Sequence, residues 1–262
     1  MRKLIKYLYK FKLLKRLIPS LLKLIVKIFK IKKIKIKHNN LTLLLNPKNP
    51  IDREIYLKDY YEKNQMSFLE NEIDKNNIDI FIDVGAHMGF YSINLSKKKI
   101  KIYSFEPIKN NYNQFKENIL INKIDNITSF NCALSNKKSI IQMWVPDENK
   151  TGGFTIFNIQ DEALKKYKSH QIHYEHSKAN LGDNLLNFKQ KKIAIKIDVE
   201  RHEEQVIMGI TKLLKNNKII IQIEIFDERK EKIFKLMNDR KYHLFNSIEK
   251  DYFFTNFEAQ NK

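Results

Sequence analysis

Phe81-Ile82-Asp83-Val84-Gly85-Ala86-His87-Met88-Gly89-Phe90-Tyr91 is the stretch that decides the fold, and Phe105-Glu106-Pro107 follows it along the chain. An apolar run ends in Asp83, and a helical pattern begins after Gly89. A second apolar run then ends in Glu106. This order predicts a strand, a tight turn, a helix and a parallel strand. The sequence therefore places a ligand-binding turn of an α/β protein near residue 85.

Residue types at this turn indicate which ligand it suits. Gly85 lets the chain turn sharply off the strand, and Gly89 lets the helix start close to a ligand. Glu106 ends the next strand, where a carboxylate can accept hydrogen bonds from both hydroxyls of a ribose. Asp83 repels a pyrophosphate but tolerates a cationic amino acid tail. The charges therefore favour S-adenosylmethionine over NAD or FAD, the alternative being a plain turn with a structurally satisfied Asp83.

A later strand also ends in carboxylates. Ile193–Ile197 is apolar apart from Lys196, and Asp198 and Glu200 follow it. If this strand neighbours the first, Asp198 stands at the switch point of the sheet, beside the cofactor crevice. Asp198 is then the first candidate to orient or deprotonate an acceptor hydroxyl, followed by Glu200 and His202. The plainer alternatives are a helix cap, an ion pair with lysine and a core histidine.

The third predicted strand ends near Asn131, Cys132 and Ala133, which in a doubly wound sheet flank the adenine of a bound cofactor. Small Ala133 suits a flat ring, and Asn131 can read its edge. Cys132 is more often a small buried hydrophobe than a reactive thiol. The predicted cofactor contacts are Asp83, Gly85, Ala86, His87, Gly89, Glu106, Asn131, Cys132, Ala133 and Asp198.

Together these motifs resemble the FkbM-type family of S-adenosylmethionine-dependent methyltransferases. The matching pieces are Ile82–Gly89, Phe105–Pro107, Asn118, Ala133–Ser135, Lys196–Glu200 with Glu203 and Gly209, and Ile223–Ile225. The family usually has Gly where this chain has Arg201, a change that narrows the site or adds a cation. The resemblance covers about residues 78–226. It implies a Rossmann-like class I fold and O-methylation, often of sugars or secondary metabolites.

The periodicity of the chain predicts the element order. Strands are expected at 78–83, 100–105, 127–132, 139–145, 193–198 and 218–225, and helices at 90–98, 109–122, 182–188, 202–215 and 229–240. Two antiparallel strands are expected at 241–246 and 250–255. The segment 146–180 reads as irregular, with Thr151–Thr155 either a flap or a turn. We predict a mostly parallel, doubly wound sheet with an antiparallel edge and helices on both faces.

Three parts follow from this order. Residues 1–37 form a basic amphipathic arm, residues 38–77 a hairpin and a helix at 52–73 packed on the core, and residues 78–262 the methyltransferase domain. In the arm, apolar residues recur every three or four positions and lysines fall largely between them, so two helices are expected at 2–17 and 21–30, separated by Pro19.

Charge is concentrated in the arm. The chain has a net charge of +19, and residues 1–40 hold 14 Lys or Arg and no Asp or Glu. A cationic amphipathic helix of this kind suits an anionic membrane surface, so residues 1–30 are expected to bind one. Packing on the body or on a second subunit, and binding to nucleic acid, are the alternatives. The sequence does not indicate an oligomeric state.

The single cysteine excludes an internal disulfide and suggests a reducing compartment. No signal peptide is apparent, so a cytoplasmic protein is expected, peripheral on the inner face of the membrane if the arm binds there. No metal site is expected, because His170, His173 and His176 would converge only on a helix.

The leading hypothesis is an S-adenosylmethionine-dependent O-methyltransferase acting on a sugar hydroxyl of a glycan or lipid-linked saccharide at the membrane surface. An RNA methyltransferase is the first alternative because of the charge, although the Asn/Asp-Pro-Pro-aromatic strand end often used for base amino groups is missing. A non-catalytic scaffold of the same fold is the second.

Overall fold

The structure, a computed structural model, describes residues 2–12, 14–146 and 172–258. The proposed flap at Thr151–Thr155 lies outside these residues. Seven strands form the central sheet in the order β11-β12-β10-β9-β3-β4-β5. Their bounds are β3 Ile80–Val84, β4 Lys101–Phe105, β5 Ile127–Phe130, β9 Lys192–Ile197, β10 Lys218–Glu224, β11 His243–Ile248 and β12 Asp251–Thr255.

The direction of these strands confirms the predicted fold class. From β10 to β5 all neighbours are parallel, whereas β12 and β11 add an antiparallel edge. Strand β3 lies between β4 and β9. From β3 the chain adds β4 and then β5 on one side, and it later returns to add β9 and β10 on the other side. The gap above β3 and β9 is therefore the switch point of the sheet, as the sequence predicted.

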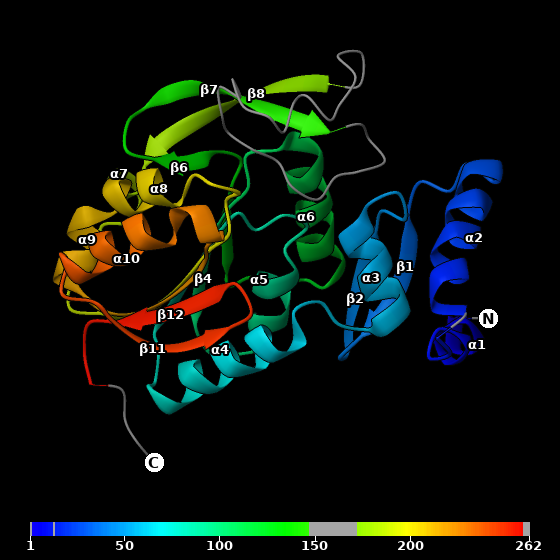
Figure 1. Cartoon of the computed structure of the whole chain (residues 1–262), viewed down its shortest axis with the longest axis horizontal. Coiled ribbons are helices and arrows are strands. Elements are labelled where there is room, and N and C mark those ends of the chain that lie inside the picture. Colours follow the sequence, from blue (N-terminus) through cyan, green and yellow to red (C-terminus); the bar gives the residue numbers. More distant parts are fainter. Residues whose placement is uncertain (1, 13, 147–171, 259–262) are drawn as a thin grey trace.

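Helices cover both faces of the sheet (Figure 1). On one face lie α8 Glu203–Gly209, α9 Thr211–Asn216 and α10 Lys230–Asn238; on the other lie α4 Lys63–Lys75, α5 Phe90–Leu95 and α6 Lys109–Ile121. Side chains alternate between these layers. Ile80, Ile82 and Val84 pack toward α8–α10, whereas Phe81 packs toward α4–α6. The short helix α7 Gly182–Leu185 and the 3-10 turn η3 Asp227–Arg229 complete the first layer.

The α4–α6 face carries a row of polar side chains across four neighbouring strands. Asp83 on β3 pairs in register with Ser104 on β4 and with Lys196 on β9, and Lys196 pairs with Gln222 on β10. All four residues are at most 3% exposed. Burying polar side chains costs free energy unless they are paired. We therefore take this row to mark the part of the core that supports a polar site above it.

A second sheet of three strands, β6 Ala133–Ser135, β8 Ile172–Leu181 and β7 Ser139–Pro146, lies over one end of the molecule (Figure 1). The prediction of irregular structure up to residue 180 is therefore wrong from Ile172 onward. Strand β8 was missed because its inward positions, Glu175, Ser177 and Ala179, carry no large apolar side chain. Its ten-residue length comes from pairing with β7 rather than from its own composition.

The N-terminal part consists of α1 Arg2–Leu8, α2 Leu14–Ile28, the hairpin β1 Ile34–His38 and β2 Leu41–Leu45, and α3 Pro50–Lys58. Pro19 lies inside α2, so the prediction that it separates two helices is wrong. Lys15, four residues earlier, is exposed, so water can solvate the carbonyl that Pro19 leaves unpaired. The predicted arm boundary at residue 37 falls within β1.

The helix expected at 52–73 is two helices, because the chain enters the left-handed region twice between α3 and α4. Asp59 caps α3 with a φ of 68° and donates its N–H to Ile55, and Glu62 precedes α4 with a φ of 46°. Arg2 reaches this corner, where its guanidinium donates to the carbonyls of Tyr56 and Ile55 and pairs with Asp59. The end of α3 therefore anchors α1 to the body.

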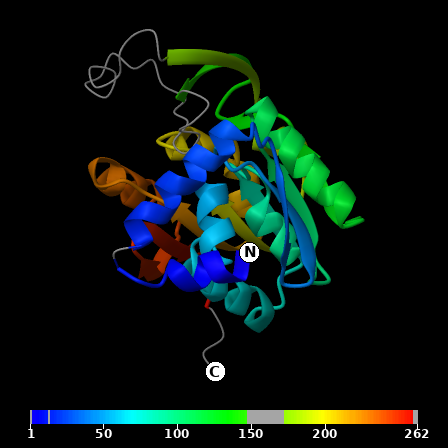
Figure 2. The same ribbon diagram turned by 90° about the vertical axis from the view of Figure 1, so that its right-hand side faces the viewer.

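Figure 2 shows α1 and α2 lying across the side of the molecule that α3 and the hairpin form. Ile18 and Val26 of α2 are buried against this side, so one face of α2 packs on the body, as in the alternative to membrane binding. In the part of the chain that the structure describes, no helix combines the length and apolarity needed to cross a membrane.

Gly89 provides a test of the fold. Its φ is 84°, and a Cβ at this position would lie 2.0 Å from the buried ring of Phe115. We expect Gly89→Ala to lower the free energy of unfolding by roughly 2–4 kcal/mol in urea denaturation, from the left-handed backbone and the clash together. The double variant with Phe115→Leu should lose less than the sum of the two single variants, and simple additivity would contradict this packing.

Candidate active site

A cavity opens at the carboxyl ends of the central strands. Its volume, including the part open to solvent, is about 810 Å³. The residues that line it are Ile51, Tyr61, Val84, Gly85, His87, Phe105, Glu106, Pro107, Ile108, Asn111, Ala133, Leu134, Met143, Asp198, Val199, Glu200 and Glu224. Four of them are acidic, and none of these described lining residues is Lys or Arg. The cavity therefore suits a cationic ligand and opposes a phosphate.

The glycine turn after β3 forms the floor of this cavity. Gly85 has a φ of 89°, and a Cβ there would lie 1.8 Å from the carbonyl oxygen of Asp198. The backbone N–H groups of Gly85 and Ala86 both donate to the carbonyl of Phe105. Only glycine fits between β3 and β9 at this point, so the turn is fixed by both neighbours of β3.

Glu106 is held in place by backbone donors. The N–H of His87 donates to its Oε2 and the N–H of Ile108 donates to its Oε1, each at 2.8 Å. Burial raises the pKa of Glu106 to about 7, although these donors act in the opposite direction. Its carboxylate lines the cavity and still has lone pairs that can accept from hydroxyl groups of a ligand.

The structure brings together half of the predicted cofactor contacts. Gly85, His87, Glu106, Ala133 and Asp198 line the cavity, whereas the other five predicted contacts do not. Those five are Asp83, Ala86, Gly89, Asn131 and Cys132.

The five remaining residues support the cavity from behind. Ser92 of α5 donates to Asp83, whose pKa burial raises to about 6, so this carboxylate stands below the turn and faces the helix. Asn131 donates to the carbonyls of Glu106 and Pro107 and thereby fixes the loop that carries Glu106. Gly89 accommodates Phe115 instead of a ligand, and Cys132 is 5% exposed.

Lys196 controls the charge of Asp198. The residue is 3% exposed, and its ammonium donates to Asp198 Oδ2 at 2.7 Å. Burial acts to raise the pKa of Asp198, but the charge and hydrogen bond of Lys196, with a hydrogen bond from Glu224, outweigh it and the pKa is lowered. Asp198 is therefore a carboxylate at neutral pH, held at the rim of the cavity.

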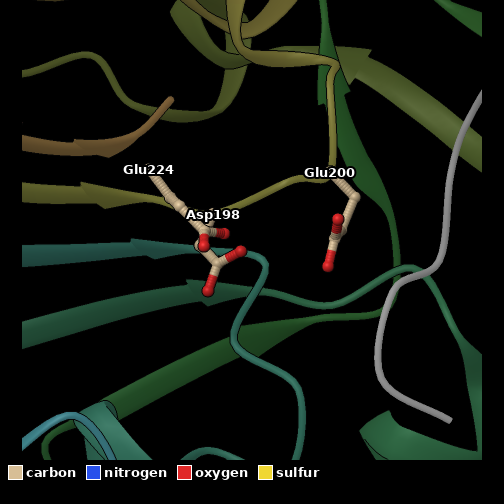
Figure 3. A group of neighbouring side chains, drawn as sticks. All are labelled: Asp198, Glu200 and Glu224. Carbon is tan, nitrogen blue, oxygen red and sulfur yellow. The ribbon is translucent and has the colours of Figure 1, made fainter. Parts of the chain in front are cut away.

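Glu224 ends β10 beside Asp198 and was not predicted as a site residue. Burial, and then the neighbouring charge of Asp198, raises the pKa of Glu224 to about 9, so Glu224 carries a proton and donates to Asp198. Figure 3 shows the two carboxyl groups side by side, with Glu200 two residues after Asp198 on the same loop. Burial and Asp198 likewise raise the pKa of Glu200 to about 7.

Oxygen atoms of Asp198, Glu200 and Glu224 all lie within 4.8 Å of one another. Carboxylate oxygens at this separation are donors that a hard divalent cation prefers, and they equally suit a cationic organic ligand. Of the histidines considered for a metal, His170 lies outside the described residues. His173 and His176 lie in strand β8 and not in the helix that their convergence would have required.

His202, the third catalytic candidate, does not line the cavity. Its Nε2 lies 3.0 Å from the hydroxyl of Ser135, which ties the start of α8 to strand β6. Burial lowers the pKa of His202 to about 4, so the ring is neutral at physiological pH. This geometry assigns it to the packing of α8.

Sequence reasoning missed Glu224, Lys196 and Tyr61 as parts of the site. Glu224 could have been found, because it ends the strand after Asp198, and parallel strands end at the same edge of a sheet. Lys196 lies in a recognisable strand, but its burial and its contacts with carboxylates from distant segments have no sequence signal. Tyr61 reaches the cavity through the corner between α3 and α4, which periodicity did not predict.

The methyltransferase FkbM domain model matches residues 83–245. The chain belongs to the FkbM methyltransferase family. This domain spans every strand end that lines the cavity, and the family, together with the acidic switch point, assigns S-adenosylmethionine as the cofactor. No match was found among curated proteins.

Solved structures with a related fold are distant in sequence. A precorrin-6y C5,15-methyltransferase from Geobacter metallireducens is 11% identical with a TM-score of 0.44, covering 76% of this chain and 89% of that chain. An rRNA methylase from Streptococcus thermophilus is 13% identical with a TM-score of 0.41, covering 73% and 92%. TYW2 from M. jannaschii, solved in complex with AdoMet, is 11% identical with a TM-score of 0.44, covering 86% and 84%.

The residues of the cavity fit this cofactor. Glu106 can accept from ribose hydroxyls, and the apolar side chains of Ile108, Leu134 and Met143 offer a surface for a flat base. The sulfonium and ammonium groups of the cofactor are positively charged, so the carboxylates at the rim of the cavity attract them. Gly85 lets the floor of the cavity lie against the backbone of Asp198, where a Cβ would come within 1.8 Å of the carbonyl oxygen.

We expect Glu106→Gln to weaken the binding of S-adenosylmethionine roughly ten- to hundredfold in calorimetry. An amide cannot accept from both His87 and Ile108 at its two ends, so the side chain turns and a charged acceptor is lost. Glu231→Gln on exposed α10 is the control. Unchanged affinity in a folded Glu106→Gln protein would remove Glu106 from the cofactor site.

The pH dependence of stability tests the role of His202. Its folded pKa of about 4 lies below the ordinary value of 6.5, so between these pH values only the unfolded chain binds the proton. Stability is complete above pH 6.5 and falls on acidification, by about 3 kcal/mol from this group. His202→Gln should remove this part of the slope, and His243→Gln, at an exposed position, should not. Equal slopes in all three proteins would contradict the assignment.

Proposed function

We propose that this protein transfers a methyl group from S-adenosylmethionine to a sugar hydroxyl of a glycan or lipid-linked saccharide at a membrane surface. The observation that carries the proposal is the carboxylate of Asp198, kept ionised by buried Lys196 at the rim of the cofactor cavity. Oxygen nucleophiles need a proton acceptor at that position, and saccharide acceptors are what the resemblance to the FkbM-type family implies.

Each residue of the site has a distinct part in this reaction. The bound cofactor supplies an electrophilic methyl group on a sulfonium. Glu106 orients the ribose, and the Gly85 turn fixes the depth of the cofactor. Asp198 accepts the hydrogen bond, and then the proton, of the acceptor hydroxyl, while Lys196 keeps its carboxylate ionised until that step. Protonated Glu224 donates to Asp198 and holds it in orientation.

We expect Asp198→Asn to reduce methyl transfer about 10²- to 10⁴-fold, because the amide cannot take a proton. The readout is labelled methyl incorporated from S-adenosylmethionine into cell-envelope glycans, with cofactor affinity measured separately by calorimetry. The amide keeps the shape of the side chain, so the loss should be in turnover more than in binding. Asp227→Asn, at an exposed position, is the matched control.

The same assay separates the competing functions. Labelled total RNA, with envelope glycans unlabelled, would identify an RNA methyltransferase and overturn the saccharide proposal. A folded protein that does not bind S-adenosylmethionine would be a non-catalytic scaffold. Equal incorporation by wild type and Asp198→Asn would remove Asp198 from the reaction.

A further inference from the structure

The arm has a second apolar stripe that the body does not cover. Helix α2 buries Ile18 and Val26 against the body, whereas Leu17, Leu21, Leu24 and Ile28 follow one another at intervals of four, three and four residues and remain exposed. Their exposed fractions are 63%, 56%, 52% and 62%. Exposed leucines are common singly, but four on one helical face form a continuous apolar surface.

A basic groove lies between α1 and the end of α3, and Lys15, two residues before Leu17 on α2, is part of its lining. It is lined by Lys3, Lys6, Lys10, Lys15 and Lys58 together with Tyr7, Tyr9, Tyr60 and Leu57. Lys6 pairs with Asp59 and Lys58 pairs with Glu54. Among the described residues, Lys3, Lys10 and Lys15 make no ion pair with a carboxylate of the chain, so their charge is available to an anion.

We propose that the apolar stripe of α2 and the basic groove together dock the protein on an anionic phospholipid bilayer, with lipid phosphates in the groove. Apolar side chains enter the region between headgroups and acyl chains, while cations beside them meet the phosphates. The inference deepens the membrane-surface location proposed above and rests on it. The groove adds Lys58 and Tyr60 of the body to the contact, so the docked surface is not the arm alone.

Two other occupants fit the same surface less well. In a two-fold dimer the surface would face its own copy, and residues 1–40 contain 14 cationic and no acidic side chains to meet each other. RNA would satisfy the lysines but would leave the leucine stripe in water, because its phosphate backbone offers no apolar partner. Of these three occupants, only a lipid surface supplies both an apolar layer and anions.

Docking in this way brings the cavity close to the bilayer. Ile51, near the start of α3, lines the cavity, whereas Tyr56 and Asp59 at the other end hold α1 through Arg2. A helix of nine residues separates these two ends, which is about 13 Å along its axis. An acceptor carried by the bilayer is therefore within reach of a site that sits one short helix away.

The test uses the full-length protein and sedimentation with vesicles of phosphatidylcholine, with and without 30 mol% phosphatidylglycerol (roughly the anionic fraction that such electrostatic binding needs). We expect binding to the anionic vesicles only, and weaker binding as salt is raised. Lys3, Lys10 and Lys15 replaced together by Gln should lower the partition coefficient about a hundredfold. Lys212, Lys215 and Lys218 replaced by Gln remove the same charge from the opposite side of the molecule and should change it far less.

A second pair of variants tests the stripe. Leu21→Glu should abolish sedimentation with anionic vesicles, whereas Leu120→Glu, at a 70% exposed leucine of α6, should preserve it. Equal binding by both variants, or concentration-dependent dimers that Leu21→Glu disperses without any vesicle binding, would overturn the proposal. So would binding to RNA alone. Sedimentation is measured independently of methyl transfer. Methylation without vesicle binding would reject the docking and the membrane location but not the methyltransferase activity, and vesicle binding without methylation would reject the activity alone.

Discussion

The buried ammonium of Lys196 is the interaction on which the site depends. It donates to Asp198 at 2.7 Å, lies 4.0 Å from Glu62 and 4.7 Å from the ring of Tyr91, and interacts with Asp251 and Asp83. Burial lowers the pKa of a lysine, but these carboxylates reverse that effect and keep the ammonium charged. Breaking a buried pair of this kind typically costs about 3–5 kcal/mol, so the cluster holds β9, β12 and the α3–α4 corner together.

The same cluster sets the charge of the cavity. Lys196 supplies one positive charge beneath the cavity, whereas several carboxylates surround it. The lining of the cavity therefore has an excess of acidic groups, at Asp198, Glu200 and Glu224. Protonation relieves part of that excess, since the pKa of Glu224 is raised to about 9 and protonated Glu224 donates a hydrogen bond to Asp198. The remaining negative potential favours a sulfonium cofactor and excludes a dinucleotide, whose pyrophosphate would meet carboxylates instead of cations.

Helix α3 connects the cavity with the N-terminal arm. At one end Asn49 caps the helix and Ile51 reaches the cavity; at the other, Asp59 ends it in a left-handed conformation and pairs with Arg2 of α1. The arm is thus fixed to the same rigid element that closes one side of the site. This arrangement joins the arm, which lies outside the matched domain, to one wall of the cavity.

The sequence alone determined the sheet, its switch point and the strand-end residues Gly85, Glu106 and Asp198, because local patterns of apolar residues and glycines encode them directly. It did not determine strand β8, which depends on pairing with β7, or the continuous helix through Pro19. From the sequence we predicted that Asp83, Asn131 and His202 contact the cofactor or the acceptor. In the structure Asp83 accepts from Ser92, and Asn131 donates to the carbonyl of Glu106. His202 lies against Ser135. Which way a polar side chain faces, and which distant charge meets it, depends on contacts between segments far apart in the chain, and no local pattern records them.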